Sequence, residues 1–266
     1  MAEHVIEDIE LRETSVDTGV PVGTVEKDLA ITCTLLAITR NRHRDHLAFK
    51  GGTAIKKVYY PGARFSEDLD FTVTDLGEEA AQLLEALSNA EINSITFGEV
   101  VEDGYTREGV RYRLPFTGPL DYRNSVRIDL SFRDDVILGP IDRTVYSSYS
   151  EDLSSTISCL RFPELMAEKI RAAMTRENPR DYYDMWAHLN KIDDKDTLRS
   201  LAQRKCGATG YPYDPSNIFE AATLRRIDSA WKTQLKHLIP DYVDFATILP
   251  QLKEEARFMF AEDLAP

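Results

Sequence analysis

The chain has 266 residues and a formal net charge of -13, from 45 Asp and Glu against 32 Lys and Arg. A hydrophobic share of 42% is that of a folded protein with one large or two modest domains, which excludes a disordered chain. No apolar run approaches the ~20 residues that span a bilayer, and the N-terminus is acidic, unlike a signal peptide. We therefore expect a cytoplasmic protein without a membrane segment.

Cysteine and charge placement exclude further classes. Cys33, Cys159 and Cys206 stand far apart, and the five His are scattered, which argues against a disulfide framework or a thiolate or histidine metal site. The acid excess argues against a protein that coats nucleic acid nonspecifically. Two stretches, 107–127 and 161–180, nevertheless hold five basic residues each, mostly Arg. These basic residues either form a solvated charged surface or provide a local binding surface for phosphate groups.

The N-terminal half alternates helical and strand patterns. Residues 25–40 lack Gly and Pro and repeat apolar residues at helical spacing, which predicts a largely buried helix. Gly51-Gly52 then opens a helix that Pro61-Gly62 ends. Residues 68–73 alternate strictly between polar and apolar side chains, which predicts a half-buried strand with Asp68 and Asp70 on its polar face.

The pattern continues through a second acidic strand. Residues 78–90 are predicted to be helical, and 95–116 a hairpin pair with turns at Asp103-Gly104 and Glu108-Gly109. Residues 125–132 alternate again, with Phe132 among the core-facing residues and Asp129 on the polar face. Asp129 is therefore expected to face the same way as the Asp68 and Asp70 pair.

From Phe162 onward the pattern is helical. Asn178 is a plausible N-cap for a helix that begins at Pro179, and further helices are predicted at about 194–205, 215–238 and 241–261. We expect a boundary near residues 155–162 between a mixed α/β half and a helical half. The predicted domains are residues 1–158 and 159–266.

Glycines followed by paired carboxylates suggest phosphate chemistry. A helix that opens at Gly51-Gly52 offers backbone N–H groups with no Cβ to obstruct them, and Thr53 adds a hydroxyl donor. Asp68 and Asp70 on one strand face suit Mg²⁺, and Asp129 could complete a two-metal arrangement. Alone, the glycines would indicate a turn and the acids a solvated pair. Their order along the chain makes the functional reading more specific.

Three motifs carry a family resemblance. Lys50-Gly51-Gly52-Thr53, Arg64 to Asp70 (RFSEDLD) and Arg180 to Asp184 (RDYYD) resemble the motifs of the AbiEii/AbiGii toxin nucleotidyltransferases, in the DNA polymerase beta-like superfamily. Glu26-Lys27-Asp28 resembles the family's lead-in, and the likeness spans about residues 25–190. One departure is Gly52-Thr53, where the superfamily often has Gly-Ser. The resemblance implies an α+β fold, with a mixed-sheet nucleotidyltransferase domain followed by a helical domain.

The resemblance also implies an activity and partners. It implies a toxin of a type IV toxin–antitoxin pair that takes an NTP with Mg²⁺ or Mn²⁺ and transfers a nucleotide to RNA, with a tRNA 3′ end as the expected acceptor. A winged-helix antitoxin would be encoded separately. Two alternatives stay open: nucleotide transfer to a protein hydroxyl or phosphoryl transfer from the same site, and a nucleotide-binding module without catalysis.

Site residues follow from the motifs and the resemblance together. The expected metal ligands are Asp68, Asp70 and Asp129. The expected catalytic residues are Asp70, Asp129, Lys169 and Asp181, although Lys169 could be a surface lysine, Asp181 could serve only the helix N-terminus, and Asp184 is the competing acid. The expected nucleotide-binding residues are Gly51, Gly52, Thr53, Lys57, Arg64, Ser66 and Lys169.

Overall fold

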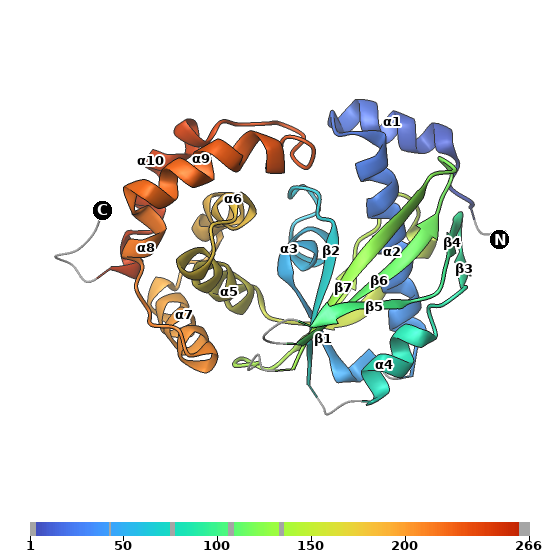
Figure 1. The fold of residues 1–266 in the computed structure, drawn as a ribbon, viewed down its shortest axis with the longest axis horizontal. Helices are drawn as coiled ribbons and strands as arrows, with labels where there is room; N and C mark the ends of the chain where they lie inside the picture. Colours follow the sequence, from blue (N-terminus) through green and yellow to red (C-terminus); the bar gives the residue numbers. More distant parts are fainter. Residues whose placement is uncertain (1–3, 43, 75–77, 106–108, 133–135, 261–266) are drawn as a thin grey trace. The chain divides into compact units, whose positions relative to one another are not determined.

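The computed structural model describes residues 4–42, 44–74, 78–105, 109–132 and 136–260. The chain divides into two compact units, Met1–Leu160 and Arg161–Pro266. Every strand belongs to the first unit, and the second is built of helices (Figure 1). In the part of the chain that is described, we find no helix with the length and apolarity to cross a membrane.

The first unit combines helices with one large sheet. Its helical segments are α1 (Asp8–Thr18), α2 (Val22–Arg40), η1 (Arg44–His46), α3 (Gly51–Ala54), the π-helical η2 (Ile55–Tyr59), α4 (Glu78–Glu85) and η3 (Glu151–Leu153). Its strands are β1 (Leu47–Lys50), β2 (Asp68–Val73), β3 (Glu91–Ile92), β4 (Ile95–Phe97), β5 (Val101–Tyr105), β6 (Gly109–Thr117), β7 (Arg123–Ser131), β8 (Ile141–Val145) and β9 (Ser155–Cys159).

Strand pairing makes a mixed sheet. The order is β3-β4-β6-β7-β2-β1-β9-β8, with β5 on the edge of β6. The β2–β7 and β1–β9 pairs are parallel, and the other pairs are antiparallel. The two strands with the predicted acidic faces, β2 and β7, are therefore direct neighbours at the centre of the sheet.

Helix α2 forms much of the core of the first unit. It is buried nearly all round and packs against β7 and β9. Because apolar residues cover most of its surface, it satisfies the pattern of an enclosed helix rather than of an amphipathic surface helix. Phe49 on β1 and Phe71 on β2 are also fully buried, with ring centroids 5.2 Å apart.

The second unit is a cluster of helices around α5. Its elements are α5 (Phe162–Thr175), α6 (Pro179–His188), η4 (Leu189–Lys191), α7 (Lys195–Thr209), α8 (Ser216–Phe219), α9 (Ala221–Leu235), α10 (Phe245–Glu255) and η5 (Arg257–Met259). Helix α5 contacts α6, α7 and α8. Tyr182 and Trp231 are fully buried, and each polar tip donates a hydrogen bond, to the carbonyls of Ile218 and Val243. Buried aromatic residues thus keep their polar atoms paired.

The structure confirms the predicted sequence of a mixed sheet followed by helices, and the Asn178 side chain caps α6 as expected. Some local predictions were wrong. Gly104 lies within β5, at an irregularity in its pairing with β6, rather than in a turn. Phe132 follows the end of β7 and is 44% exposed, because the strand's alternation stops at Ser131.

Helix lengths also differ from the predictions. The helix expected at 78–90 ends at Glu85, and the one expected at 215–238 breaks at Glu220 into α8 and α9. The last predicted helix is shorter, Phe245–Glu255, and continues in η5. Glu108 of the second predicted turn and residue 261 of the last helix lie outside the described residues.

Replacing Gly109 by Ala should separate β6 from β7. A Cβ at Gly109 would lie 1.7 Å from the carbonyl oxygen of Leu130, an overlap with backbone that no rotamer relieves. We expect Gly109→Ala to lower the free energy of unfolding by about 1–3 kcal/mol, as overpacking does. Gly207→Ala is the control, because Gly207 lies within α7 with open space around it. That change should stabilise by about 0.4–1 kcal/mol. Urea denaturation followed by circular dichroism measures both, and equal stability of Gly109→Ala and wild type would contradict the expectation.

Candidate active site on the central strands

The turn between β1 and α3 lies directly against a carboxylate. Gly51 has a φ of +77°, a conformation that side chains other than glycine rarely adopt. A Cβ at this position would lie 2.0 Å from Oδ2 of Asp70. Glycine is therefore required at position 51 for two reasons, the backbone conformation and the close approach of the chain to Asp70.

The second glycine lies under two predicted nucleotide-binding residues. A Cβ on Gly52 would meet Nη2 of Arg64 at 2.8 Å and Oγ of Ser66 at 3.3 Å. Both side chains are buried, and Nη1 of Arg64 donates to the carbonyl of Phe65. The structure thus brings Gly52, Arg64 and Ser66 together, with a guanidinium and a hydroxyl over the backbone of the turn.

Two carboxylates stand side by side on β2 and β7. Asp70 is opposite Asp129 in the parallel register, and the row extends to Lys50 on β1 and Arg111 on β6. Directly opposed residues share a face of the sheet. The row therefore consists of two central carboxylates, on β2 and β7, with a basic residue on each outer side, on β1 and β6. Asp129 accepts from Nε of Arg111 at 2.8 Å and from Nη2 at 3.4 Å.

Asp68 lies in the next row of the same face. It is opposite Arg127 on β7, and Nη1 of Arg127 approaches its Oδ1 to 3.5 Å. The structure thus puts the three predicted metal ligands on one face of two neighbouring strands. Two of them, Asp68 and Asp129, are paired with arginine.

The donor chemistry of these residues fits a magnesium or manganese ion. Carboxylate oxygens are the ligands such hard cations prefer, and the opposed positions of Asp70 and Asp129 put two of them on adjacent strands. Across the described ranges, however, no three acidic, His or Cys side chains converge as a metal cluster. Both oxygens of Asp129 already accept hydrogen bonds from Arg111.

Thr53, a predicted nucleotide-binding residue, makes a hydrogen bond within the fold. Its hydroxyl donates to the backbone carbonyl of Asp68, and the residue is buried. A hydroxyl has a single proton to donate, so this bond uses the proton that the prediction assigned to a phosphate. Thr53 instead joins the helix after the glycine turn to the start of β2.

Lys57 points into the protein interior. Its Nζ lies 2.6 Å from Oδ2 of Asp28 and 2.8 Å from Oγ1 of Thr32, both on α2, and the lysine is 2% exposed. The Tyr149 hydroxyl also donates to Asp28, and burial together with that carboxylate raises the pKa of Tyr149. The expected contact of Lys57 with a nucleotide is not what this geometry favours, because its charge is already paired. The ion pair holds η2 against α2.

In the second unit, Lys169 lies between two acids. Its Nζ is 3.0 Å from Oδ1 of Asp181 and 2.8 Å from Oδ2 of Asp184. Lys169 is only 9% exposed, so it is not the surface lysine of the alternative reading. Arg176 adds a two-pronged contact to Asp181, with Nε at 2.8 Å from Oδ2.

Asp181 is held ionised although it is fully buried. Burial alone would raise the pKa of its carboxyl group, but the charges of Lys169 and Arg176 outweigh that effect and the pKa is lowered. Asp181 therefore fits an anchor for Lys169 better than a proton acceptor. The choice between Asp181 and Asp184 has no single answer in this geometry, because both carboxylates contact the lysine.

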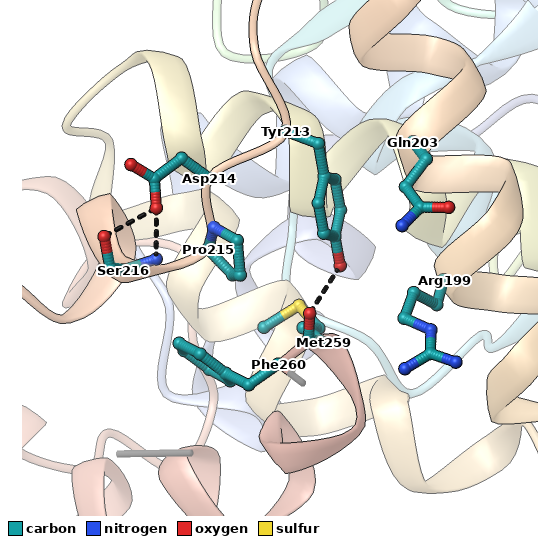
Figure 2. A pocket seen from close by; sticks show the side chains of 8 residues that line it. All are labelled: Arg199, Gln203, Tyr213, Asp214, Pro215, Ser216, Met259 and Phe260. Atoms are coloured by element: carbon teal, nitrogen blue, oxygen red, sulfur yellow. Dashed lines mark hydrogen bonds between the residues drawn. The ribbon is translucent and has the colours of Figure 1, made fainter. Parts of the chain in front are cut away.

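A cavity of about 630 Å³ lies elsewhere in the second unit. It is lined by Arg199, Gln203, Tyr213, Asp214, Pro215, Ser216, Met259 and Phe260. Figure 2 shows the Tyr213 hydroxyl donating to the carbonyl of Met259, at 3.0 Å. Burial raises the pKa of Tyr213 to about 12, so the hydroxyl keeps its proton at neutral pH. None of the sequence-predicted site residues lines this cavity.

Sequence reasoning missed the partners of the predicted residues. Lys50 and Arg111 flank the acidic row only because of strand register, which a single sequence does not reveal. In the sequence, Asp28 stands out only as part of a motif, and Arg111 and Arg176 only as members of arginine-rich stretches. The pairing of a basic with an acidic residue on separate elements leaves no local signal.

Comparison with known proteins gives a family and a fold. The family model described as "Nucleotidyl transferase AbiEii toxin, Type IV TA system" matches residues 34–255. MenT4, a nucleotidyltransferase toxin from Mycobacterium tuberculosis H37Rv, superposes with a TM-score of 0.76 at 16% identity, over 97% of this chain and 91% of that one. JHP933 from Helicobacter pylori gives a TM-score of 0.59 at 17% identity, over 88% and 92%. A search of curated proteins found no match.

Removing one member of the buried ion pair should destabilise the first unit. Lys57→Met leaves Asp28 buried without its cation, and we expect a loss of about 3–5 kcal/mol in the free energy of unfolding. The double variant with Asp28→Leu should recover most of that loss, because no unpaired charge remains. Lys56→Met is the matched control, because Lys56 lies on the same helix and its Nζ donates to the carbonyls of Pro61 and Ala63 rather than to a carboxylate. Denaturant titration measures all three, and a double variant no more stable than Lys57→Met would refute this view of the pair.

Proposed function

We propose that this chain, which belongs to the AbiEii nucleotidyl transferase toxin family of type IV toxin–antitoxin systems, transfers a nucleotide from an NTP to an RNA acceptor. The acceptor we propose is the 3′ end of a tRNA, and the reaction uses Mg²⁺ or Mn²⁺. We assign this chemistry to the first unit, which carries the glycine turn and the acidic strands.

The observation that carries the proposal is the placement of Asp70. Its carboxylate lies against the backbone of Gly51 and opposite Asp129 on the neighbouring strand. A glycine turn meets anions through backbone N–H groups, and paired carboxylates meet divalent cations. A complex of a divalent metal with a nucleoside triphosphate is the substrate class that needs an anion-binding turn and paired carboxylates at one place.

Each residue of the face has a role in the proposed reaction. Gly52, Arg64 and Ser66 bind phosphate oxygens, since a guanidinium forms strong charge-assisted hydrogen bonds to phosphate. Asp68, Asp70 and Asp129 hold the divalent ion, which when bound supplies charge stabilisation at the reacting phosphate. Catalysis is then mainly positioning and electrostatics.

The transfer step balances as follows. A hydroxyl oxygen of the acceptor forms a bond to the α-phosphorus of the NTP, the bond from that phosphorus to the β-phosphate bridging oxygen breaks, and pyrophosphate leaves. Asp129 is the proposed acceptor of the hydroxyl proton, because it lies beside Asp70 on the same face. Lys169 and Asp181 of the second unit stay predicted catalytic residues, with Asp181 as the ionised partner of the lysine.

The biological setting follows from the family. We propose that a separately encoded winged-helix antitoxin counteracts this toxin, and that both act in the cytoplasm. Arginine-rich β6 and β7 support an RNA acceptor, because Arg111, Arg113, Arg123 and Arg127 all lie on this pair of strands. Three of them form ion pairs with aspartates, and their side chains are 37–50% exposed, so their guanidinium groups are within reach of an RNA phosphate.

The proposal predicts a transfer product that depends on Asp70. The protein is incubated with each labelled NTP, Mg²⁺ and either total RNA or an RNA-depleted lysate. We expect label in RNA, reduced about 100-fold or more by Asp70→Asn, since a group that stabilises the reacting phosphate is worth roughly 10²–10³ in rate. Asp45→Asn is the control, because the Asp45 side chain is 81% exposed.

Other outcomes would reassign the chemistry. Label confined to protein bands would replace the RNA acceptor by a protein hydroxyl. NTP binding without label in any fraction would mean a binding module without catalysis. Toxicity is read separately, and expression that slows growth equally with wild type and Asp70→Asn would contradict a toxin that acts by transfer.

A further inference from the structure

The acidic row is electrically balanced by side chains alone. Lys50 and Arg111 stand at its two ends, and Asp70 and Asp129 occupy the middle. Like charges directly opposite each other on adjacent strands repel, and the flanking cations offset that repulsion. A divalent ion bound by the two carboxylates would therefore add positive charge to a row in which two basic residues already balance the two acids.

Arg111 is a flanking cation in direct contact with a proposed metal ligand. Its guanidinium reaches both oxygens of Asp129, at 2.8 and 3.4 Å, so each oxygen already has a cationic partner. Arg127 makes a looser contact to Asp68, at 3.5 Å through one nitrogen. The Arg111 contact to Asp129 is thus closer than the Arg127 contact to Asp68.

The contact is also one that can open. The Arg111 side chain is 37% exposed and that of Asp129 is 25% exposed, so water can solvate the guanidinium once it leaves. Partly exposed ion pairs of this kind contribute little net stability. Arg111 therefore occupies Asp129, but the small net stability of the ion pair allows another cation to displace it.

We propose that Arg111 and a divalent cation compete for the carboxylate of Asp129, so that Arg111 sets how tightly the enzyme binds its metal. This inference rests on the proposed function, which assigns Asp129 to the metal. Arg111 is thus a positioning residue that keeps the two opposed carboxylates together while no metal is bound. Metal binding requires its guanidinium to swing off Asp129.

Binding of Mn²⁺ alone, without nucleotide, tests the competition directly. The free Mn²⁺ signal in electron paramagnetic resonance gives the dissociation constant for the full-length protein and its variants. Arg111→Gln removes the competing charge, and we expect it to bind Mn²⁺ about three- to tenfold more tightly, the range that an exchanged, partly exposed ion pair allows. Arg111→Lys keeps the charge without the two-pronged contact and should fall between Arg111→Gln and wild type.

A matched variant separates contact from general electrostatics. Arg113→Gln makes the same charge change two residues along β6, at a side chain that pairs with Asp103 instead of with a proposed ligand. If Arg113→Gln tightened Mn²⁺ binding as much as Arg111→Gln, the effect would be one of net charge and the competition would be refuted. Combining Arg111→Gln with Asp129→Asn should leave Mn²⁺ affinity no different from that of Asp129→Asn alone.

Two results would overturn the inference outright. Mn²⁺ binding that Arg111→Gln leaves unchanged would mean that the guanidinium is no obstacle, and weaker binding would mean that Arg111 helps to orient Asp129 for the metal. Circular dichroism spectra confirm that each variant is folded. Failure of the transfer assay with wild-type protein would remove the proposed reaction, whereas these Mn²⁺ affinities are measured without any transfer.

Discussion

Two negative charges that repel each other occupy the centre of the sheet, and much of the first unit is arranged around them. Asp70 and Asp129 are direct neighbours on parallel strands. Nothing about packing requires two carboxylates there, and opposed like charges cost stability. Lys50 and Arg111 on the outer strands of the row offset that cost. An unfavourable pair that is kept and counterbalanced in this way is characteristic of a functional site.

Specific hydrogen bonds and an ion pair hold the helical segment next to the acidic face of β2 and β7 in place. Thr53 donates to the carbonyl of Asp68, and Lys57 forms a buried ion pair with Asp28 on α2. Both residues are predicted to bind the nucleotide, and in the structure both fasten the helical segment that follows the glycine turn.

How far the sequence predicted this arrangement differs from one feature to the next. Strict alternation predicted β2 and the inward and outward faces of β7, because the pleat imposes a period of two residues. The glycine turn and its helix were also predicted, since few other patterns place two glycines before a helical run. The ion pair of Lys57 with Asp28 was not predicted, because a lysine in a helix next to a polar motif looks the same whether it faces a nucleotide, solvent or a buried acid.

Strand register was the feature that could be predicted least well from the sequence. The opposition of Asp70 to Asp129, and of Arg111 to Asp129, depends on which residues of distant segments pair, and several registers fit the same alternation. The net charge of -13 misleads for the same reason, since it averages over the whole chain. In the structure, arginines and a lysine adjoin the acids that were expected to hold metal, so the local balance differs from the global count.

We propose that nucleotide transfer requires the backbone of Gly51 to lie against the carboxylate of Asp70. The most direct measurement is the rate of nucleotide transfer by Gly51→Ala, beside Gly23→Ala, where a Cβ would meet open space. We expect a loss of about 100-fold for Gly51→Ala in a folded protein, as when a catalytic group is displaced by about 1 Å. Gly23→Ala should transfer at a rate within about twofold of wild type. A folded Gly51→Ala variant that transfers nucleotide at the wild-type rate would contradict the proposal.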